Sequence, residues 1–335
     1  MKNFLLKYKT LIGLAVSLIF LYLALRKIDF NDVVQIFSRS NPSTIIFIIL
    51  LAFLVRMILT VRWYLLLHFT EKRNLRDTFN YLNIGYLIND ILPGRIGDFV
   101  KSFFWAKKVK VSKADALASV IVERLFDLTG MGLIFLLALL ILDLPAYALT
   151  GGTILILLCF IGFFGLLLLA MNNSKLSHFQ NKYRNKKILN WILIKVNKLS
   201  IYSAFLINLR LTFTLILLTI LVWFIYLFSG FLIIENLHPS QFSWHTALVS
   251  LLFISVAFVI PSTPGNLGVY QYACILAFDI TSVGYSREEA LVFSLISQLP
   301  VYCLTLLLGI YSSYSEGFKL SKLKKYTQNL ETAES

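Results

Sequence analysis

Two matching stretches of sequence decide the fold, Asn89-Asp-Ile-Leu-Pro-Gly-Arg-Ile-Gly-Asp-Phe99 and Pro261-Ser-Thr-Pro-Gly-Asn-Leu-Gly-Val-Tyr270. Each places a Pro-Gly pair, with a second glycine three residues further on, inside apolar sequence. The corresponding residues are Pro93, Gly94, Gly97 and Phe99 in the first stretch and Pro264, Gly265, Gly268 and Tyr270 in the second. Apolar helices that break at the same places in both halves of a chain are typical of membrane transporters.

The composition indicates an all-α polytopic membrane protein. Of the 335 residues, 58% are hydrophobic and 14% are charged, and the mean hydropathy is +0.77. An ordinary soluble domain carries about 25% charged residues, and several apolar runs here reach the roughly 20 residues that cross a bilayer. No alternating strand pattern supports a barrel. The positive charges, +14 net, lie between the apolar runs, so they indicate a membrane surface and no nucleic acid partner.

Apolar runs predict six membrane-crossing helices and two interrupted stretches. The six helices are expected at 10–25, 43–69, 114–142, 150–171, 210–235 and 287–312. The interrupted stretches are 79–107 and 244–280, each split by a Pro-Gly turn. Their halves are too short for full crossings, which favours hairpins that enter the membrane and return to the same side.

The positions of lysine and arginine decide between re-entrant hairpins and single crossings. With two re-entrant hairpins, 22 basic residues fall on the cytoplasmic side, in 1–9, 70–78, 101–113, 172–209 and 313–335. The opposite side then holds four, Arg26, Lys27, Arg39 and Arg287. A single crossing at 79–107 would instead place the basic segment 107–113 outside. The preference for positive charge in cytoplasmic loops therefore favours the re-entrant hairpins and places both termini in the cytoplasm.

The topology predicts an inverted repeat within one transmembrane domain, residues 1–315. Repeat one spans about 43–142 and repeat two about 210–312, and three crossings separate their starts, so their orientations are opposite. The hairpin tips are expected to meet near the middle of the membrane. Residues 316–335 form a polar cytoplasmic tail. The basic segment 172–209 is either an interfacial amphipathic helix or a plain cytoplasmic loop.

Charged residues inside apolar helices are candidates for function because charge is costly in a bilayer. Glu123, Arg124 and Asp127 lie roughly ten residues into the helix that starts near 114, on the order of 15 Å deep. Glu123 and Asp127 are four residues apart and share a face, and Arg124 can pair with one of them. The cluster is either a structural ion pair or part of a binding site, and one cluster can serve both purposes.

A second group of charges follows the first Pro-Gly turn. Arg95, Asp98 and Lys101 lie on the short helix whose free N–H groups would favour an anion. The planar guanidinium of Arg95 suits phosphate, so we hypothesise that it binds a lipid head group while Glu123 and Asp127 hold Arg124. Alternatively, Arg95 pairs with one of those two carboxylates and closes the turn.

Two further arginines lie in the helix predicted at 43–69. Arg62 is close enough to the helix end to extend to the cytoplasmic face. Arg56 is deeper in the membrane, and a charge at that depth is harder to explain without a function.

The second half offers polar groups without charge at the matching places. Asn266 and Gln271 follow the second Pro-Gly turn, and Gln298 occupies the repeat position of Arg124. These residues either hydrogen-bond a head group or satisfy the backbone of a broken helix. Gln298 at the depth of Arg124 supports a site between the repeats.

No enzyme signature is present. The four histidines are scattered without metal spacing, and the chain has neither a P-loop nor a dinucleotide fingerprint. We therefore expect no cofactor, no metal and no catalytic residue.

Three motifs, in order, resemble those of the lysylphosphatidylglycerol synthase transmembrane family, also called flippase-like proteins. They are Leu92-Pro-Gly-Arg-Ile-Gly-Asp98, Glu123-Arg-Leu-Phe-Asp127 and Pro261-Ser-Thr-Pro-Gly-Asn-Leu-Gly268. The resemblance covers roughly residues 10–315 and includes the membrane half of the bacterial multiple peptide resistance factor. It implies a multi-pass protein of the bacterial plasma (inner) membrane that moves lipids. One departure is Gln271, where the family motif often ends in Gly-x-x-Glu.

The sequence thus predicts an integral membrane lipid flippase for an anionic phospholipid or a polyprenyl-phosphate-linked lipid. Its expected partners are a membrane lipid with a phosphate head group and a lipid-modifying enzyme or glycosyltransferase. Two alternatives stay open, an aminoacyl-tRNA-dependent phosphatidylglycerol lysyltransferase and a small-solute transporter. The longest cytoplasmic segment, 172–209, is far below the roughly 50 residues of a small domain, which argues against the transferase.

Overall fold

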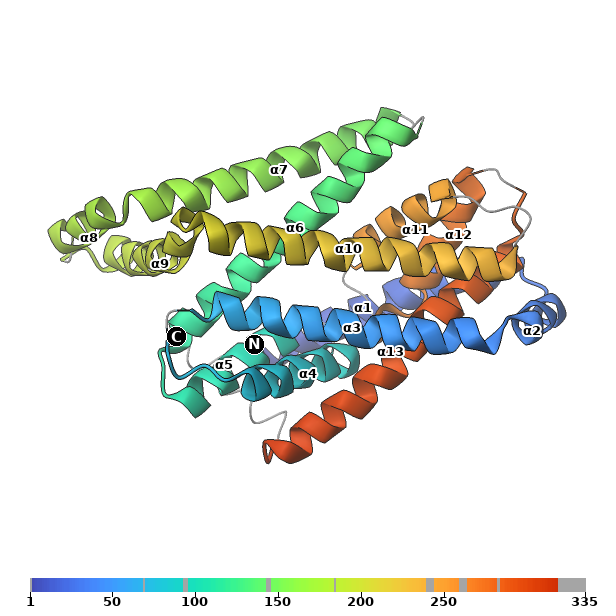
Figure 1. Ribbon diagram of the computed structural model, residues 1–335, viewed down its shortest axis with the longest axis horizontal. Coiled ribbons are helices and arrows are strands. Elements are labelled where there is room, and N and C mark those ends of the chain that lie inside the picture. The colour runs from blue at the N-terminus through green and yellow to red at the C-terminus, as the bar shows by residue number, and fades with distance from the viewer. Residues whose placement is uncertain are drawn as a thin grey trace.

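The computed structural model describes residues 2–68, 70–92, 96–142, 146–183, 185–238, 244–258, 264–281 and 284–318, and in these ranges it is helical without strands (Figure 1). The helices are α1 (Lys2–Leu25), α2 (Phe30–Arg39), α3 (Pro42–Leu66), α4 (Leu75–Ile91), α5 (Gly97–Val109), α6 (Lys113–Ile141), α7 (Ala146–Met171), α8 (Asn173–Lys182), α9 (Lys187–Ser203), α10 (Leu209–Leu237), α11 (Trp244–Ala257), α12 (Val269–Thr281) and α13 (Arg287–Ser315). Two 3-10 turns are η1 (Ala204–Ile207) and η2 (Pro264–Asn266).

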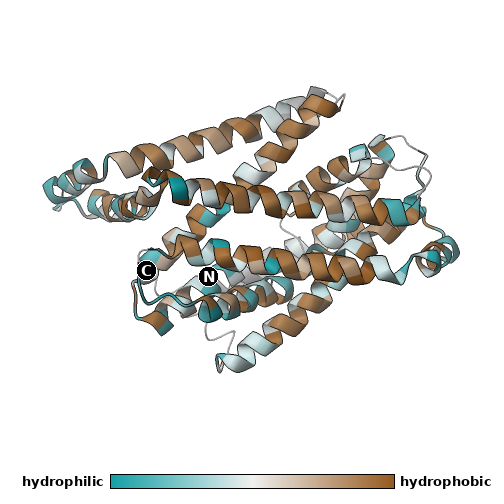
Figure 2. Ribbon diagram, in the orientation of Figure 1, coloured by the Kyte–Doolittle hydropathy of each residue, from teal (hydrophilic) through white to brown (hydrophobic). Residues whose placement is uncertain are grey.

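Within the part of the chain that the structure describes, five helices are long and apolar enough to cross a membrane. They are the segments Pro42–Leu66, Asp115–Ile141, Gly152–Met171, Leu209–Leu237 and Arg287–Ser315. Hydrophobic residues cover α3, α7 and α10 along most of their length (Figure 2). The prediction of a polytopic helical membrane protein is therefore confirmed. The sixth predicted helix, 10–25, is part of α1, which begins earlier, at Lys2.

Each Pro-Gly stretch separates two short helices that pack against each other, α4 with α5 and α11 with α12. The longest of the four, α4, has 17 residues and is about 26 Å long, below the roughly 30 Å of a bilayer's hydrocarbon. Pro93, Gly94 and Arg95 of the first turn lie outside the described residues. In the second turn Gly265 and Gly268 have φ angles of +74° and +84°, the left-handed region that favours glycine.

Polar contacts at one end of the molecule, which we call end A, join both ends of the first hairpin. Lys108 in the last turn of α5 lies 3.0 Å from Asp77 in the first turn of α4. The same amino group lies 2.7 Å from Glu316, which directly follows α13. Asn80 of α4 also donates a hydrogen bond to Glu316, at 2.7 Å. The first hairpin therefore begins and ends at end A, together with the end of α13.

The second hairpin begins and ends at the opposite end, which we call end B. The backbone N–H of Asn41, the N-cap of α3, donates to the side chain of Asn236 near the end of α10, at 2.8 Å. Helices α3 and α10 are therefore antiparallel, and α11 starts at end B because it follows α10 after a short connection. The last turn of α12 is held there as well, by the ion pair of Asp279 with Arg287 at the start of α13, 2.7 Å. The two hairpins open toward opposite ends.

We call α3–α6 unit one and α10–α13 unit two. Within each unit the first helix packs on the hairpin and the hairpin packs on the last helix. Between the units, α4 packs on α13, α11 packs on α6, and α3 packs on α10 (Figure 1). The turn η2, at the tip of the second hairpin, packs on α4 of the first. The same set of contacts thus occurs in both directions between the units.

Helix α2 was not predicted. Its start is set by Asp29, whose carboxylate accepts a hydrogen bond from the N–H of Asn31 at 2.8 Å, as an N-cap does. Val33 is buried, whereas Val34 and Phe37 are exposed. A ten-residue amphipathic helix of this kind gives no long apolar run, so a search for membrane-crossing segments misses it.

The basic segment 172–209 forms helices α8 and α9 and the turn η1 rather than a loop. On α9, Trp191 and Ile192 are exposed, and the amino group of Lys195 lies 3.6 Å from the centre of the Trp191 ring. Exposed apolar side chains beside lysines are typical of a helix that lies at a membrane interface. These contacts favour the interfacial alternative over the plain loop.

The polar tail starts later than expected. Glu316 is bound at end A, and Phe318 is buried with 9% exposure. Residues 319–335 lie outside the described residues.

The Glu316 contact predicts a pH dependence. Burial acts to raise the pKa of its carboxyl, but hydrogen bonds from Lys108 and Asn80 outweigh it and hold the pKa below the ordinary value of 4.5. The contribution to stability is therefore complete above about pH 4.5 and is lost as the pH falls through the lower folded-state pKa. We expect Glu316→Gln to lower the melting temperature in detergent at pH 7. The loss in the free energy of unfolding should be about 1 kcal/mol or less, because Lys108 is 41% exposed. A difference between variant and wild type that persists unchanged at pH 3 would contradict an ionic contact.

Candidate functional site

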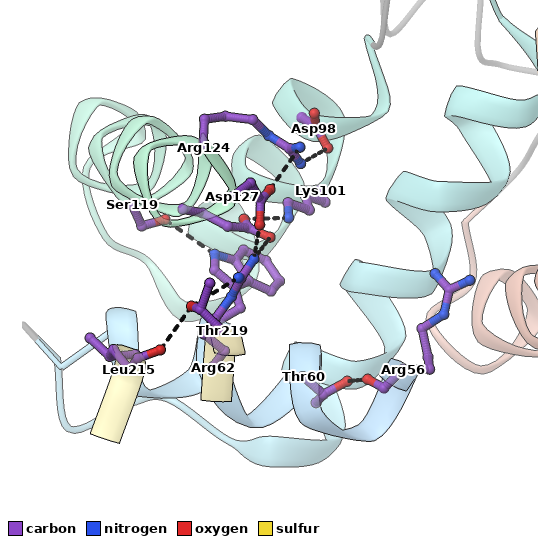
Figure 3. A network of polar contacts seen from close by, with 12 residues as sticks. Arg56, Thr60, Arg62, Asp98, Lys101, Ser119, Arg124, Asp127, Leu215 and Thr219 are labelled. Carbon is purple, nitrogen blue, oxygen red and sulfur yellow. Dashed lines mark hydrogen bonds and ion pairs between the residues drawn. The ribbon is translucent and has the colours of Figure 1, made fainter. Parts of the chain in front are cut away.

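Six ionisable side chains from α3, α5 and α6 meet inside unit one (Figure 3). We call them the charged network: Arg62, Asp98, Lys101, Glu123, Arg124 and Asp127. Five of the six belong to the predicted site residues, and the structure brings all five together. The sixth, Arg62, is close enough to its helix end to extend to the cytoplasmic face, but in the structure its side chain is 1% exposed and ion-paired.

Glu123 occupies the most buried part of the charged network, with 1% exposure. Its carboxylate lies 2.6 Å from the amino group of Lys101 and 3.9 Å from the guanidinium of Arg62. Lys101 is itself 2% exposed, and its amino group lies 4.8 Å from the centre of the Trp63 ring. Trp63 is held in turn by a hydrogen bond from its indole N–H to Ser119, 3.2 Å.

Asp127 joins two arginines. It lies 2.5 Å from Arg62 and 3.0 Å from Arg124, and Arg124 continues to Asp98 of α5 at 3.1 Å. The hypothesis that Glu123 and Asp127 together hold Arg124 is thus half right. Asp127 does hold it, but Glu123 points to Lys101 instead, because adjacent residues leave a helix in different directions.

The charged network balances its own charge, with three cations and three anions. A buried ion costs several kcal/mol when it lacks a partner, so a balanced set is the arrangement that a low-dielectric interior tolerates. Exposure is not uniform within the network. Arg124 is 34% exposed and Asp127 30%, whereas Lys101 and Glu123 are sealed. Arg124 is therefore the cation that a ligand can approach.

The start of α5 is already supplied with polar partners. The backbone N–H of Gly97 donates to the side-chain oxygen of Asn89 at 2.8 Å, and the amide nitrogen of Asn89 donates to Asp98 at 3.3 Å. The glycine also allows α5 to approach α4, because an added Cβ at Gly97 would lie 1.9 Å from the carbonyl oxygen of Gly85. An anion at this helix start, held by Arg95, stays a prediction, since Arg95 lies outside the described residues.

Near its tip, the hairpin of unit two is fastened by neutral groups. The side chain of Gln271 accepts from the N–H of Gly268 at 2.7 Å and donates to Gln298 at 2.7 Å. Gln298 donates to the carbonyl of Gly265 at 2.9 Å, and the hydroxyl of Tyr302 donates to the same carbonyl. Gln298 therefore ties the second hairpin to α13 as Arg124 ties the first to α6. Gln271 is used within the protein, and Asn266 has a left-handed φ of +53° at the tip.

Several residues of the site are not among those predicted from the sequence. Asn89 and Tyr302 hold the two hairpins, and Trp63, Ser119 and Thr219 line the charged network. Asn89 lies inside the quoted turn stretch, and Tyr302 comes one helical turn after Gln298, so both could have been suspected. Thr219, which Arg62 contacts at 3.4 Å, carries no local signal because it comes from α10 of the other unit.

Comparison with known proteins identifies the family of the chain. A family model described as the lysylphosphatidylglycerol synthase TM region matches residues 10–309. A UPF0104 membrane protein of Methanocaldococcus jannaschii is 30% identical over 225 residues, which cover 64% of this chain and 89% of the relative. A second UPF0104 membrane protein of the same organism is 27% identical over 132 residues, 38% of this chain and 39% of the relative. No solved structure matches. The chain belongs to the lysylphosphatidylglycerol synthase transmembrane-region family.

Proposed function

We propose that this protein is a lipid flippase for an anionic phospholipid or a polyprenyl-phosphate-linked lipid. The observation that carries the proposal is the pair of polar-fastened helix hairpins that open toward opposite ends of the molecule. In a membrane these would be two re-entrant hairpins in an inverted repeat, the plan by which many transporters alternate access to one site.

Rocking of unit two against unit one supplies the movement. Each hairpin is tied to its neighbouring helix by a polar link, the partly exposed pair of Arg124 with Asp98 in unit one and the buried pair of Gln298 with Gln271 in unit two. Opening a link inside a bilayer leaves polar groups without partners, which is costly. A phosphate head group offsets that cost when it replaces Asp98 on Arg124, because guanidinium and phosphate form strong paired hydrogen bonds. Binding of the lipid head group and opening of the hairpin link are thereby coupled.

Two other activities compete with transport of lipid. The family description names a lysylphosphatidylglycerol synthase, and the inverted plan is also used by small-solute transporters. One assay separates the transferase from the flippase. Purified protein in liposomes with charged lysyl-tRNA and phosphatidylglycerol makes lysyl-phosphatidylglycerol only if the chain is the transferase.

We expect the protein in liposomes to speed leaflet exchange of a fluorescent phosphatidylglycerol by at least about tenfold over protein-free liposomes, and to make no lysyl lipid. Gly265→Val should slow this exchange by roughly tenfold or more, because a side chain at φ +74° is strained and its Cβ would lie 2.3 Å from the hydroxyl of Tyr302. Gly165→Val is the matched control, since an added Cβ there meets nothing within 4 Å.

Two outcomes would count against the flippase, and a third would count against a gating role for the second hairpin. Lysyl transfer by the isolated chain would favour the enzyme. Absence of exchange for phosphatidylglycerol and for a polyprenyl phosphate would favour a small solute. Equal exchange by Gly265→Val and wild type would show that the second hairpin does not gate transport.

A further inference from the structure

Arg56 is a buried cation that the charged network does not include. It lies in α3 six residues before Arg62, about 9 Å along the helix axis and on a different side of it. Its side chain is 5% exposed. Figure 3 shows the two arginines well apart, with Arg56 directed away from the ion pairs of Asp127.

The guanidinium of Arg56 has incomplete partners. One nitrogen, Nη2, donates to the hydroxyl of Thr305 on α13 at 2.9 Å. Its central carbon lies 3.8 Å from the centre of the Tyr86 ring on α4. The other terminal nitrogen, Nη1, is buried and donates to no atom of the described residues. Among those residues, no carboxylate oxygen lies within 4.0 Å of the guanidinium nitrogens, the distance limit of an ion pair. Asp90, one turn beyond Tyr86 on α4, still interacts electrostatically with Arg56.

An incompletely paired, buried guanidinium is energetically unfavourable if its role is only structural. A buried charge with an unused donor costs several kcal/mol, and a structural arginine is normally completed by a carboxylate, as Arg62 is by Asp127. Among the described residues, Arg56 therefore has no carboxylate in direct contact, and the charge that acts on it from Asp90 is not part of an ion pair. A missing anion would supply both the opposite charge and the acceptor for Nη1.

The location of Arg56 fits an anion that is handled by both units. Its neighbours come from α3 and α4 of unit one and from α13 of unit two. Tyr302, three residues before Thr305 and on the same face of α13, holds the carbonyl of Gly265 at the tip of the second hairpin. The tip of the second hairpin and Arg56 therefore bond to neighbouring residues of α13.

We propose that Arg56 is an oxyanion site of phosphate chemistry at the interface of the two units, with the hydroxyl of Thr305 as a second ligand. Here Nη1 is sealed, so the anion enters when the second hairpin moves off α4. Tyr86 fixes the plane of the guanidinium by stacking, which preserves its fork for two phosphate oxygens. For a lipid phosphate the site deepens the proposed flippase, on which that part of the inference rests. For inorganic phosphate it does not depend on transport.

The test compares melting temperatures of the full chain with two probes. Inorganic phosphate is titrated in detergent against chloride at equal ionic strength, and phosphatidylglycerol nanodiscs are compared with phosphatidylcholine nanodiscs. We expect wild type to be stabilised and Arg56→Gln to need about tenfold or more of the probe for the same shift. Arg287→Gln, at the partly exposed ion pair of end B, should respond as wild type does. A response to both probes identifies the phosphate group as the ligand, and a response to phosphatidylglycerol alone identifies the lipid.

A stability measurement separates a ligand site from a structural arginine. Arg56→Met replaces an incompletely paired charge with an apolar chain of similar length, so without phosphate it should melt above wild type and should not respond to either probe. The proposal is overturned if Arg56→Met melts below wild type, if neither probe stabilises wild type, or if Arg56→Gln responds as wild type does.

Failure of the site and failure of the flippase are distinguishable. If wild type exchanges lipid and Arg56→Gln exchanges it equally fast, transport stands and the Arg56 site falls. If phosphate binding depends on Arg56 but wild type exchanges no lipid, the site stands and the flippase falls.

Discussion

Replacing Glu123 with alanine is expected to destabilise the protein by about 3–5 kcal/mol, which would prevent folding of a marginal membrane protein. The carboxylate is 1% exposed and lies 2.6 Å from Lys101 and 3.9 Å from Arg62. Its removal leaves Lys101 without its ion-pair partner and the network with one excess positive charge. The measurement is the midpoint of thermal or denaturant unfolding in detergent, with recovery of folded protein as a first readout.

A double variant tests whether the loss is electrostatic. Glu123→Met with Lys101→Met removes both charges and keeps the volume, so it should recover much of the stability that Glu123→Ala loses. If the double variant is as unstable as Glu123→Ala, packing rather than charge explains the effect. If Glu123→Ala alone unfolds at the wild-type midpoint, the ion pair with Lys101 is not formed.

Replacing Gly97 with alanine is the second change of large expected effect. An added Cβ would lie 1.9 Å from the carbonyl oxygen of Gly85 and 2.7 Å from the side-chain oxygen of Asn89. Backbone cannot move aside as a flexible side chain can, so α5 must separate from α4. We expect a loss of at least about 3 kcal/mol in the free energy of unfolding.

Two other glycines provide a graded comparison for Gly97→Ala. At Gly85 the nearest atoms to an added Cβ are at 3.0 Å, so Gly85→Ala should cost less. At Gly165 nothing lies within 4 Å, so Gly165→Ala should be neutral or gain up to about 1 kcal/mol from helix propensity. A measured order other than Gly97, Gly85 and Gly165 would contradict the close crossing of α4 and α5.

The long apolar helices and the two split stretches were predictable from the sequence because each rests on local pattern. An apolar run of about 20 residues reports a crossing directly, and the Pro-Gly turns report a break. The start of α1 at Lys2 and the helix α2 were not predictable in this way. Polar or alternating residues at a membrane interface form helices without the continuous apolar signal.

The ion-pair partners within the charged network could be predicted from the sequence only in part. The spacing of Glu123 and Asp127 predicted a shared face, and both do point into the same network. The choice of partners depends on which helices meet, however, and this is a tertiary property. From the sequence, Arg62 was therefore considered only as able to extend to the cytoplasmic face, although it pairs with Asp127 from another helix, and Lys101 was not recognised as the partner of Glu123.

The two hairpins are held with unequal strength, which affects how the protein fluctuates when no ligand is bound. Near the tips of the hairpins, a charged hydrogen bond ties α5 to α6, whereas amide hydrogen bonds tie α12 to α13, and bonds between ions are roughly twice as strong as neutral ones. We expect thermal fluctuation to release the second hairpin more often than the first. If the protein is the flippase proposed above, it then samples one leaflet more readily than the other. Such a preference sets how quickly each leaflet is visited, but without an energy source it leaves the final distribution of lipid unchanged.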